Sequence, residues 1–333
     1  MNKTYLFITA LFVLIFMSCQ SRKKNNAEKQ NEIELVAEKQ LVFPLDEQTY
    51  YLSKSMFQFE ENGKEYLHFE NTRKSLYDIV IFDIENKQIA KRIPLHKTGP
   101  NGLPAVYGSR PSPDSKQILI SQNNIGRLST INNQGEVVHN YPVKTPEGRF
   151  TTFFFCSYYN APAFVKDSCI FLNQGIFKPN MKREDWPQTH MFASQNLETG
   201  KFEWVPIFYP PIFKEEYENI DGGYGFSYDY NYKESRLVCG FFGYDSLMVT
   251  DDLKHIRWYN AKSKYLKSMK PKLGNAMAGI NSIIEFCEAP MYWHIMYDKY
   301  RDVYYRFAEM PYKLAPNESP MTNPKERSSP SLY

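Results

Sequence analysis

The chain has 333 residues, a formal net charge of +3 at pH 7 and an aromatic content of 16%. So small a net charge gives no electrostatic footprint for nucleic acid, and we expect no nucleic-acid partner. The length suffices for one large domain or two smaller ones. Tyr and Phe supply most of the aromatic residues, which favours strands over helices.

The first 19 residues are typical of an export signal. A positively charged start precedes an apolar run over residues 6–17. A run of about a dozen residues suits the apolar core of a signal peptide, whereas a membrane-spanning helix needs about 20. The string FMSC at residues 16–19 resembles a bacterial lipobox, with Phe16 where leucine is usual. The resemblance implies a signal peptide over residues 1–18, cleavage before Cys19 and lipidation of its thiol. The alternative is a plain secretory signal with an incidental cysteine.

Residues 19–40 are polar, charged and poor in aromatic side chains, and we predict that they form a solvated tether. The lipid chains on Cys19 would anchor this tether in a membrane. By resemblance to Gram-negative lipoproteins, Gln20 after the lipidated cysteine, in place of aspartate, indicates the outer membrane. The run at residues 22–24 is basic, whereas some surface-exported lipoproteins carry acidic runs there. We therefore predict the periplasmic face over the cell surface.

One pattern recurs in residues 41–333: an apolar strand, a tight polar turn and a second strand. The turns lie at residues 85–87, 133–135, 198–200 and 251–253. Each pair of strands follows another apolar run bounded by polar turns, so a repeat offers about four short strands, which is the unit of a β-propeller blade. We predict an all-β propeller of four-stranded antiparallel sheets, with six blades and seven as the alternative. A pair of β-sandwich domains is the rival architecture.

The C-terminal segment does not fit the repeat. Residues 314–333 are rich in Pro and Ser and do not read as two further strands. Either the segment near residues 41–43 closes the ring, or the chain is shorter than its relatives. The sequence leaves both open.

Three stretches together resemble a known family: HKTGPNGLPAVYG (residues 96–108), WYNAKSKYL (258–266) and YDKYRDVYYRF (297–307). With the lipobox, they are similar to a family of Gram-negative lipoproteins that carry a TolB-like six-bladed propeller and are classified as a domain of unknown function. The resemblance implies a fold and an export route. It implies no reaction and no catalytic residues.

The residues that commonly carry catalysis or metal form no recognisable motif, and we expect no metal and no cofactor. The six histidines do not stand at ligand spacing. Four cysteines follow Cys19 without the close pairs of a zinc site; they are Cys156, Cys169, Cys239 and Cys287. The sequence leaves two alternatives for these cysteines. Cys156 and Cys169 could form a disulfide across a hairpin, or the cysteines could be buried free thiols.

The long segments between repeats are the candidates for a binding face, because functional residues often lie on loops held by a rigid scaffold. Arg110, Arg149, His190 and Tyr224 belong to these segments and would line one pocket if the segments gather at one end of the ring. The alternative is that they pack separately along the rim.

The function that we predict is binding of a protein, peptide or glycan by a tethered propeller. The alternative is a hydrolase or lyase acting on a glycan or peptide, with catalytic groups spread over several blades. Such an enzyme could use a carboxylate pair, either Asp78 with Asp83 or Asp229 with Asp245. Whether the protein is an enzyme stays open, with binding favoured.

Overall fold

The computed structural model describes residues 41–49, 56–71, 77–112, 114–122, 126–143, 154–155, 157–158, 161–174, 187–210, 226–266, 290–310 and 331–332. Residues 41–333 form one compact unit. The predicted lipidation site, Cys19, lies outside the described residues. Within those residues, no helix has the length and apolar character needed to cross a membrane.

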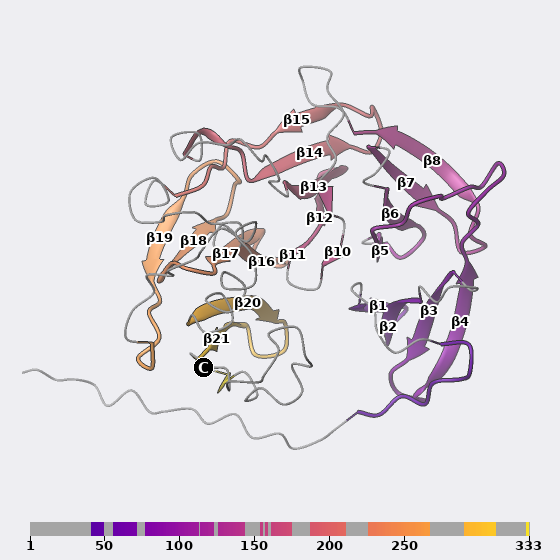
Figure 1. Ribbon diagram of the computed structural model, residues 1–333, viewed down its shortest axis with the longest axis horizontal. Coiled ribbons are helices and arrows are strands. Elements are labelled where there is room, and N and C mark those ends of the chain that lie inside the picture. The colour runs from indigo at the N-terminus through magenta and orange to yellow at the C-terminus, as the bar shows by residue number, and fades with distance from the viewer. Residues whose placement is uncertain are drawn as a thin grey trace, which may run out of the picture. The chain divides into compact units, whose positions relative to one another are not determined.

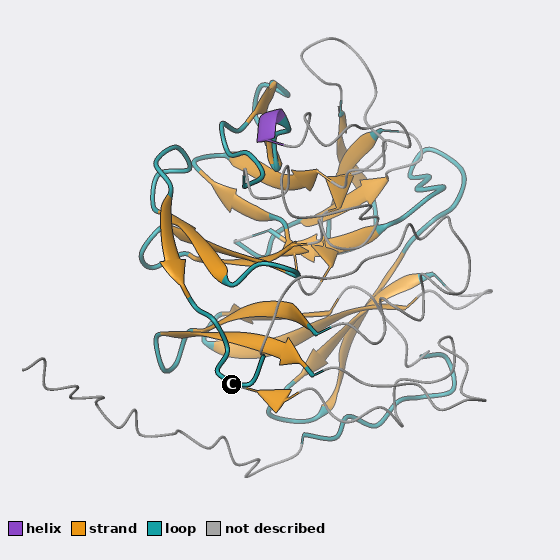
Figure 2. Cartoon of the chain, turned by 60° about the vertical axis from the view of Figure 1, so that its left-hand side comes forward, coloured by secondary structure: helices purple, strands orange, loops and turns teal. Residues whose placement is uncertain are grey.

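The named elements of the described chain are all β-strands, and Figure 2 shows one short helical turn besides them, at residues 187–188. Blade 1 consists of β1 (Met56–Glu61), β2 (Lys64–Asn71), β3 (Asp78–Asp83) and β4 (Gln88–Pro94). Blade 2 consists of β5 (Gly108–Pro111), β6 (Ile118–Gln122), β7 (Arg127–Ile131) and β8 (Val137–Pro142).

The chain continues with three more sheets. Blade 3 consists of β12 (Phe164–Lys166), β13 (Cys169–Gln174), β14 (Phe192–Asn196) and β15 (Phe202–Trp204), and β9 (Phe154–Phe155) also pairs with β13. Blade 4 consists of β16 (Phe226–Asn231), β17 (Arg236–Phe241), β18 (Ser246–Thr250) and β19 (Arg257–Asn260). Blade 5 consists of β20 (Met291–Asp298), β21 (Val303–Glu309) and β22 (Ser331–Leu332). A separate hairpin joins β10 (Ser157–Tyr158) to β11 (Ala161–Pro162).

The sheets follow one another around a ring, and in blades 1 to 4 the first strand lies nearest the middle and the fourth strand at the rim (Figure 1). Neighbouring strands within a blade are antiparallel. The predicted all-β propeller fold is confirmed. Among the described residues, blades 1, 2 and 4 have four strands, blade 3 has four with β9 as a fifth, and blade 5 has three, so the total of six blades stays a prediction.

The recurrent turns found in the sequence all join the third and fourth strands of a blade. Their polar residues satisfy the backbone of the turn. In the β14–β15 turn, the Asn196 side-chain oxygen accepts hydrogen bonds from the backbone N–H groups of Glu198 (2.9 Å) and Thr199 (2.7 Å). Asp252 does the same in the β18–β19 turn for Lys254 and His255. Asn and Asp recur in these turns because their short side chains replace missing backbone partners.

Each blade is covered by the next through an apolar cluster. Between blades 1 and 2 the cluster includes Ile79, Ile93 and Ile118. Between blades 4 and 5 it includes Val238 and Ile295. Because both faces of an inner sheet are buried, all six residues of β3 are buried, whereas all four residues of the outer strand β19 are exposed.

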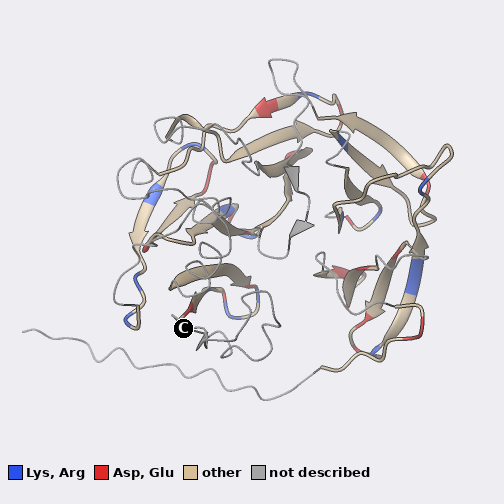
Figure 3. Cartoon of the chain, viewed as in Figure 1, with Lys and Arg blue, Asp and Glu red and all other residues tan. Residues whose placement is uncertain are grey.

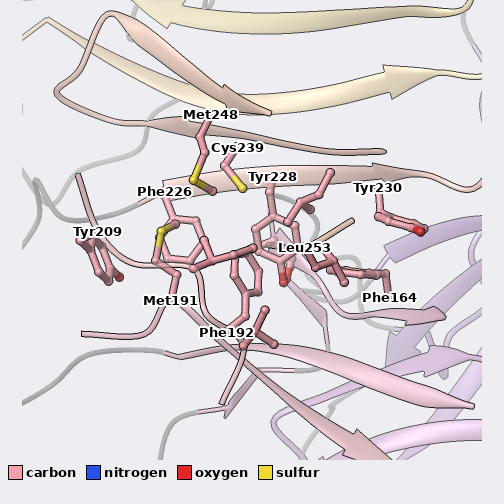
Figure 4. Packing of buried hydrophobic residues seen from close by; sticks show 14 of the residues in the cluster. Phe164, Met191, Phe192, Tyr209, Phe226, Tyr228, Tyr230, Cys239, Met248 and Leu253 are labelled. Atoms are coloured by element: carbon pink, nitrogen blue, oxygen red, sulfur yellow. The ribbon is translucent and has the colours of Figure 1, made fainter. Parts of the chain in front are cut away.

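The cluster between blades 3 and 4 is rich in aromatic side chains (Figure 4). The Phe164 ring stacks on Phe171 at 4.8 Å between centroids and on Tyr230 at 4.3 Å. Tyr228 is fully buried, and its hydroxyl donates to the Ala161 carbonyl oxygen at 3.1 Å. Aromatic residues bury large areas, so this interface is a major source of stability for the ring.

Blades 1 and 5, at the two ends of the described ring, are in contact. Lys299, in the β20–β21 turn, lies with its ammonium nitrogen 3.1 Å from a carboxylate oxygen of Glu65 on β2. The Tyr300 hydroxyl donates to the same carboxylate and accepts a hydrogen bond from the Gln58 side chain at 3.1 Å. Blade 5 is therefore tied to blade 1 by polar contacts.

The segment 41–49 packs on blade 1 and has no strand. Phe43 lies against Phe82, with ring centroids 5.6 Å apart, and Asp46 pairs with Arg92 at 2.7 Å. The C-terminal segment supplies the short strand β22, which pairs with β21. These contacts do not choose between the two alternatives from the sequence, which are closure of the ring by residues 41–43 and a chain shorter than its relatives.

Candidate functional site

Arg110 lies on β5, the innermost strand of blade 2, where side chains from several blades meet. Its guanidinium carbon is 5.5 Å from the centroid of the Phe57 ring on β1. One terminal nitrogen donates to the Tyr232 hydroxyl, just after β16, at 3.3 Å. That hydroxyl also accepts the backbone N–H of Val165 on β12 at 3.3 Å. We call Phe57, Arg110, Tyr232 and the nearby Asp229 of β16 the axial cluster. Together with Val165, this cluster joins the inner strands of blades 1 to 4.

The charge of Arg110 is not neutralised by a direct ion pair with any described carboxylate. Its second terminal nitrogen is buried and has no hydrogen-bond partner among the described residues. Its positive charge favours the ionised form of Asp229, yet burial dominates and raises the pKa of that carboxyl. The two Asp229 oxygens instead accept the backbone N–H groups of Tyr230 and Tyr297, both at 2.8 Å. Arg110 thus keeps donor capacity that a carboxylate ligand would use.

Next to Arg110, three polar groups join blades 1 and 2. His68 Nε2 is 2.8 Å from the Ser109 hydroxyl oxygen, and that hydroxyl donates to a Glu70 carboxylate oxygen at 3.1 Å. A hydroxyl has one proton, so His68 Nε2 must be the donor to Ser109. Burial, followed by the charge of Arg110, lowers the pKa of His68 to about 3, so the ring is neutral at neutral pH.

This arrangement does not activate a nucleophile. In a serine hydrolase the histidine accepts the serine proton and the carboxylate holds the opposite ring nitrogen. Here Ser109 lies between the other two groups, donates to Glu70 and is fully buried. The three residues serve as a polar bridge between blades.

The predicted residue His190 lies elsewhere. Its ring stacks on Trp204 of the outer strand β15, with centroids 5.4 Å apart and planes at 8°. Its Nδ1 is 2.7 Å from the Val205 carbonyl oxygen, and the Phe208 ring also contacts it, with centroids 4.5 Å apart. No described contact joins His190 to Arg110. Arg149 and Tyr224 lie outside the described residues, so a pocket shared by all four stays a prediction.

The carboxylates suggested as catalytic pairs have structural partners. Asp78 pairs with Arg92 at 2.6 Å, and Asp83 accepts the backbone N–H of Asn86 at 2.8 Å. These two stand at opposite ends of β3, about 17 Å apart at the usual rise per residue, so this pair is not formed. Asp245 accepts the Tyr292 hydroxyl at 2.8 Å.

The described cysteines carry free thiols. Cys169 is partly exposed and accepts a hydrogen bond from Asn196 at 3.6 Å. Cys239 is fully buried, which raises the pKa of its thiol. Cys156 and Cys287 lie outside the described residues.

Charge gives no further guide to a site, because acidic and basic residues are interspersed over the blades (Figure 3). The sequence did not identify Phe57 or Asp229 as partners of Arg110. A signal existed for Tyr232, which closes the Gly- and Tyr-rich segment at residues 221–232.

Comparison with known proteins gives a family and no activity. A family model described as a domain of unknown function, DUF4221, matches residues 32–330. A crystal structure of a DUF4221 family member from Bacteroides vulgatus ATCC 8482 is 82% identical, with a TM-score of 0.83, and the match covers 89% of this chain and 82% of that chain. No curated protein matches the chain.

Two further solved structures are far less similar. A candidate exported protein of Bacteroides fragilis NCTC 9343 is 10% identical, with a TM-score of 0.49 and coverage of 80% of this chain and 74% of that chain. The β-propeller domain of Cps50 (Swd1) from Myceliophteria thermophila is 10% identical, with a TM-score of 0.35 and coverage of 86% and 73%.

Proposed function

The chain belongs to the DUF4221 family, and from the geometry around Arg110 we propose that it is an exported lipoprotein whose propeller binds a carboxylate-bearing peptide, protein or glycan at the axis of the ring. The family model and the 82% identical crystal structure confirm the family inferred from the sequence, and the ring of antiparallel sheets confirms the propeller fold. The proposal adds a tether through Cys19, the periplasmic face of the outer membrane and a ligand class.

The observation that carries the binding proposal is the unused donor capacity of Arg110. Four other arginines of the described chain, at positions 92, 236, 257 and 301, have carboxylate partners, and Arg306 bonds to backbone carbonyls. Arg92 bonds to Asp78 at 2.6 Å, and Arg236 bonds to Asp251 at 2.9 Å. Arg110 has an aromatic ring and a tyrosine hydroxyl, and a buried terminal nitrogen without a partner. A buried donor left unpaired is costly, and a ligand carboxylate would satisfy it with a charge-assisted hydrogen bond.

The neighbouring residues favour binding over catalysis. Ser109 donates to Glu70, and Asp229 accepts backbone hydrogen bonds with both oxygens. Neither is poised to attack a substrate or to exchange a proton with it. The hydrolase or lyase alternative would require groups from other blades beside Arg110.

The binding proposal is tested by affinity capture. The mature protein, Arg110→Gln and the matched control Arg127→Gln on β7 of the same blade are immobilised and exposed to a cell-envelope extract. We expect wild type and the control to capture the same component and Arg110→Gln to lose at least about 30-fold in affinity, because truncating one partner of a desolvated charge pair costs about 2 kcal/mol or more. Methyl esterification of the carboxylates in the extract should abolish capture. Equal capture by Arg110→Gln, or from the esterified extract, would remove Arg110 from the site.

The tether is tested separately through Cys19. Because lipidation requires the thiol, Cys19→Ser should leave the membrane fraction or accumulate as uncut precursor. The readouts are fractionation and the mass of the mature protein. A variant that fractionates like wild type and has a normal mature mass would refute the anchor and leave the binding proposal intact.

A further inference from the structure

A cavity of about 220 Å³ lies between blades 1 and 2, and Arg110 is not among the residues that line it. Its apolar walls come from both blades: Phe59, Tyr66, Ile81, Ile93 and Ile118. The Phe59 and Tyr66 rings stack at 5.6 Å between centroids with planes at 27°, so part of the wall is aromatic. The cavity is a separate feature from the axial cluster.

Its size fits one substituted aromatic ring. An apolar protein cavity of about 150 Å³ binds benzene. A volume of about 220 Å³ therefore leaves room for a ring and one small polar substituent. A ring would lie well against Phe59 and Tyr66, because aromatic pairs prefer offset or edge contacts at such distances.

One residue of the lining has a buried polar atom without a partner among the described residues. His68 lines it and is fully buried. Since Nε2 of His68 donates to Ser109, Nδ1 is left with a free lone pair, and it has no hydrogen-bond partner among the described residues. Nδ1 can only accept, so the group that satisfies it must be a donor.

The walls are held by a close contact between blades. Asn133, in the β7–β8 turn of blade 2, lines the cavity, and Gly135 of the same turn packs on Pro94 at the end of β4. A Cβ atom at Gly135 would lie 2.0 Å from the Pro94 carbonyl oxygen, and the residue has φ of +84°. Only glycine allows this approach, so the turn is fixed against blade 1 and the cavity is preformed.

We propose that this cavity binds a phenol group, with the ring between the apolar walls and the hydroxyl donating to His68 Nδ1. Glu61, Lys91 and Asn133 supply polar groups to the lining and suit the rest of a larger ligand. The phenol could come from a free small molecule or from a tyrosine side chain of a peptide, and the experiment separates the two.

The test uses the full mature protein and two probes that share one ring. Binding of 4-methylphenol and of toluene is followed by calorimetry and by long-range ¹⁵N NMR of the histidine rings. We expect 4-methylphenol to bind at least about tenfold more tightly than toluene, because toluene leaves Nδ1 unpaired. The ¹⁵N resonance of the unprotonated His68 nitrogen should move when 4-methylphenol is added and stay in place with toluene. N-acetyltyrosinamide forms the peptide arm: binding tighter than that of 4-methylphenol assigns the site to a tyrosine side chain, and weaker binding assigns it to a small phenol.

A variant that fills the cavity tests whether the ligand binds there. Ala90 on β4 lines the cavity and is exposed, so Ala90→Leu should fill the space without disturbing the fold. Gln88→Leu adds the same side chain two residues earlier on β4, at another exposed position, and is the matched control. We expect Ala90→Leu to lose at least about tenfold in affinity and Gln88→Leu to bind like wild type. Equal binding of the two probes, no binding of either at millimolar concentration, or unchanged binding by Ala90→Leu would each overturn the proposal.

Discussion

Arg306 offers a direct test of how blades 4 and 5 are joined. It lies on β21, and its two terminal nitrogens donate to four backbone carbonyl oxygens. These belong to Asp245 (2.7 Å), Ala261 (3.1 Å), Phe241 (3.2 Å) and Tyr244 (2.5 Å). All four acceptors lie in blade 4 or in the residues that directly follow its strands. One side chain from blade 5 therefore supplies hydrogen-bond donors to four backbone carbonyls of the neighbouring blade.

The cost of removing Arg306 follows from the groups that it leaves behind. The Asp245 carbonyl also accepts the N–H of Ala261 at 3.2 Å, and the Phe241 carbonyl accepts that of Tyr244 at 3.4 Å. The carbonyls of Ala261 and Tyr244 lose the bonds described here. Both residues are half-buried, so we take about 1 kcal/mol for each, the lower end of the cost of an unpaired buried group.

The aromatic partner adds to this cost. The guanidinium carbon of Arg306 is 3.3 Å from the centroid of the Tyr292 ring, and a desolvated contact of this kind contributes about 2 kcal/mol. Against this stands the desolvation of the charge, which lowers the pKa of Arg306 to about 10. We therefore expect Arg306→Met to lower the free energy of unfolding by about 4 kcal/mol, which lowers Tm by roughly 10 °C in a unit of this size.

Urea and thermal unfolding of the two proteins measure the effect. Arg301→Met is the control, because the Arg301 side chain is 70% exposed and pairs with Asp298 three residues away. Its loss should cost less than about 1 kcal/mol. Arg306→Lys should also be destabilised, since an ammonium cannot reproduce the planar fork that reaches four carbonyls. If Arg306→Met loses no more than the control, the assignment of this side chain as the link between blades 4 and 5 is wrong.

Two further predictions concern the loss of stability at acid pH and the cooperativity of the ring as a whole. The pKa of His68 is lowered from 6.5 to about 3 by burial and by Arg110, so between these values the folded protein binds one proton fewer than the unfolded chain. Stability is therefore lost as the pH falls, by up to about 1.4 kcal/mol per pH unit in that window. Urea midpoints measured from pH 7 to pH 4 should show a shallower decline for His68→Gln, and equal slopes would contradict the assignment. Deleting residues 237–259 uncovers the facing sheets of two blades, so the product should be insoluble or protease-sensitive in limited proteolysis. A soluble deletion product with a sharp melting transition would argue for independent domains.

The fold was predictable because the same local rule repeats along the chain. Asn196 and Asp252 each satisfy the backbone of a turn between the third and fourth strands, and such turns leave a visible mark in the sequence. The apolar runs that flank them are buried on both faces by neighbouring blades, as in β3. The number of blades was not decided in the same way, because the terminal segments carry no comparable repeat.

The candidate site was only partly predictable because it depends on the angle between blades. Arg110 was selected for its place near a strand end, and the structure brings it to the axis. Its partners Phe57 and Tyr232 come from other blades, and neither stands at a fixed spacing from Arg110 in the sequence. His190 was selected by the same reasoning, yet its contacts are with the outer strand of blade 3. Position in a long segment therefore did not distinguish an axial residue from a rim residue.

The two proposed sites follow from one property of a ring built from similar sheets. Wherever blades meet, polar groups on their facing strands must find partners across the interface, as Ser109 does with His68 and Glu70. A buried polar atom without such a partner is costly to folding, so its presence needs a compensating role. The terminal nitrogen of Arg110 and Nδ1 of His68 are two such atoms, and they differ in kind. The first is a cationic donor that selects a carboxylate, and the second is a neutral acceptor that selects a hydroxyl or N–H donor. Substitution of one should therefore leave ligand binding at the other in place, which separates the axial proposal from the phenol proposal by experiment.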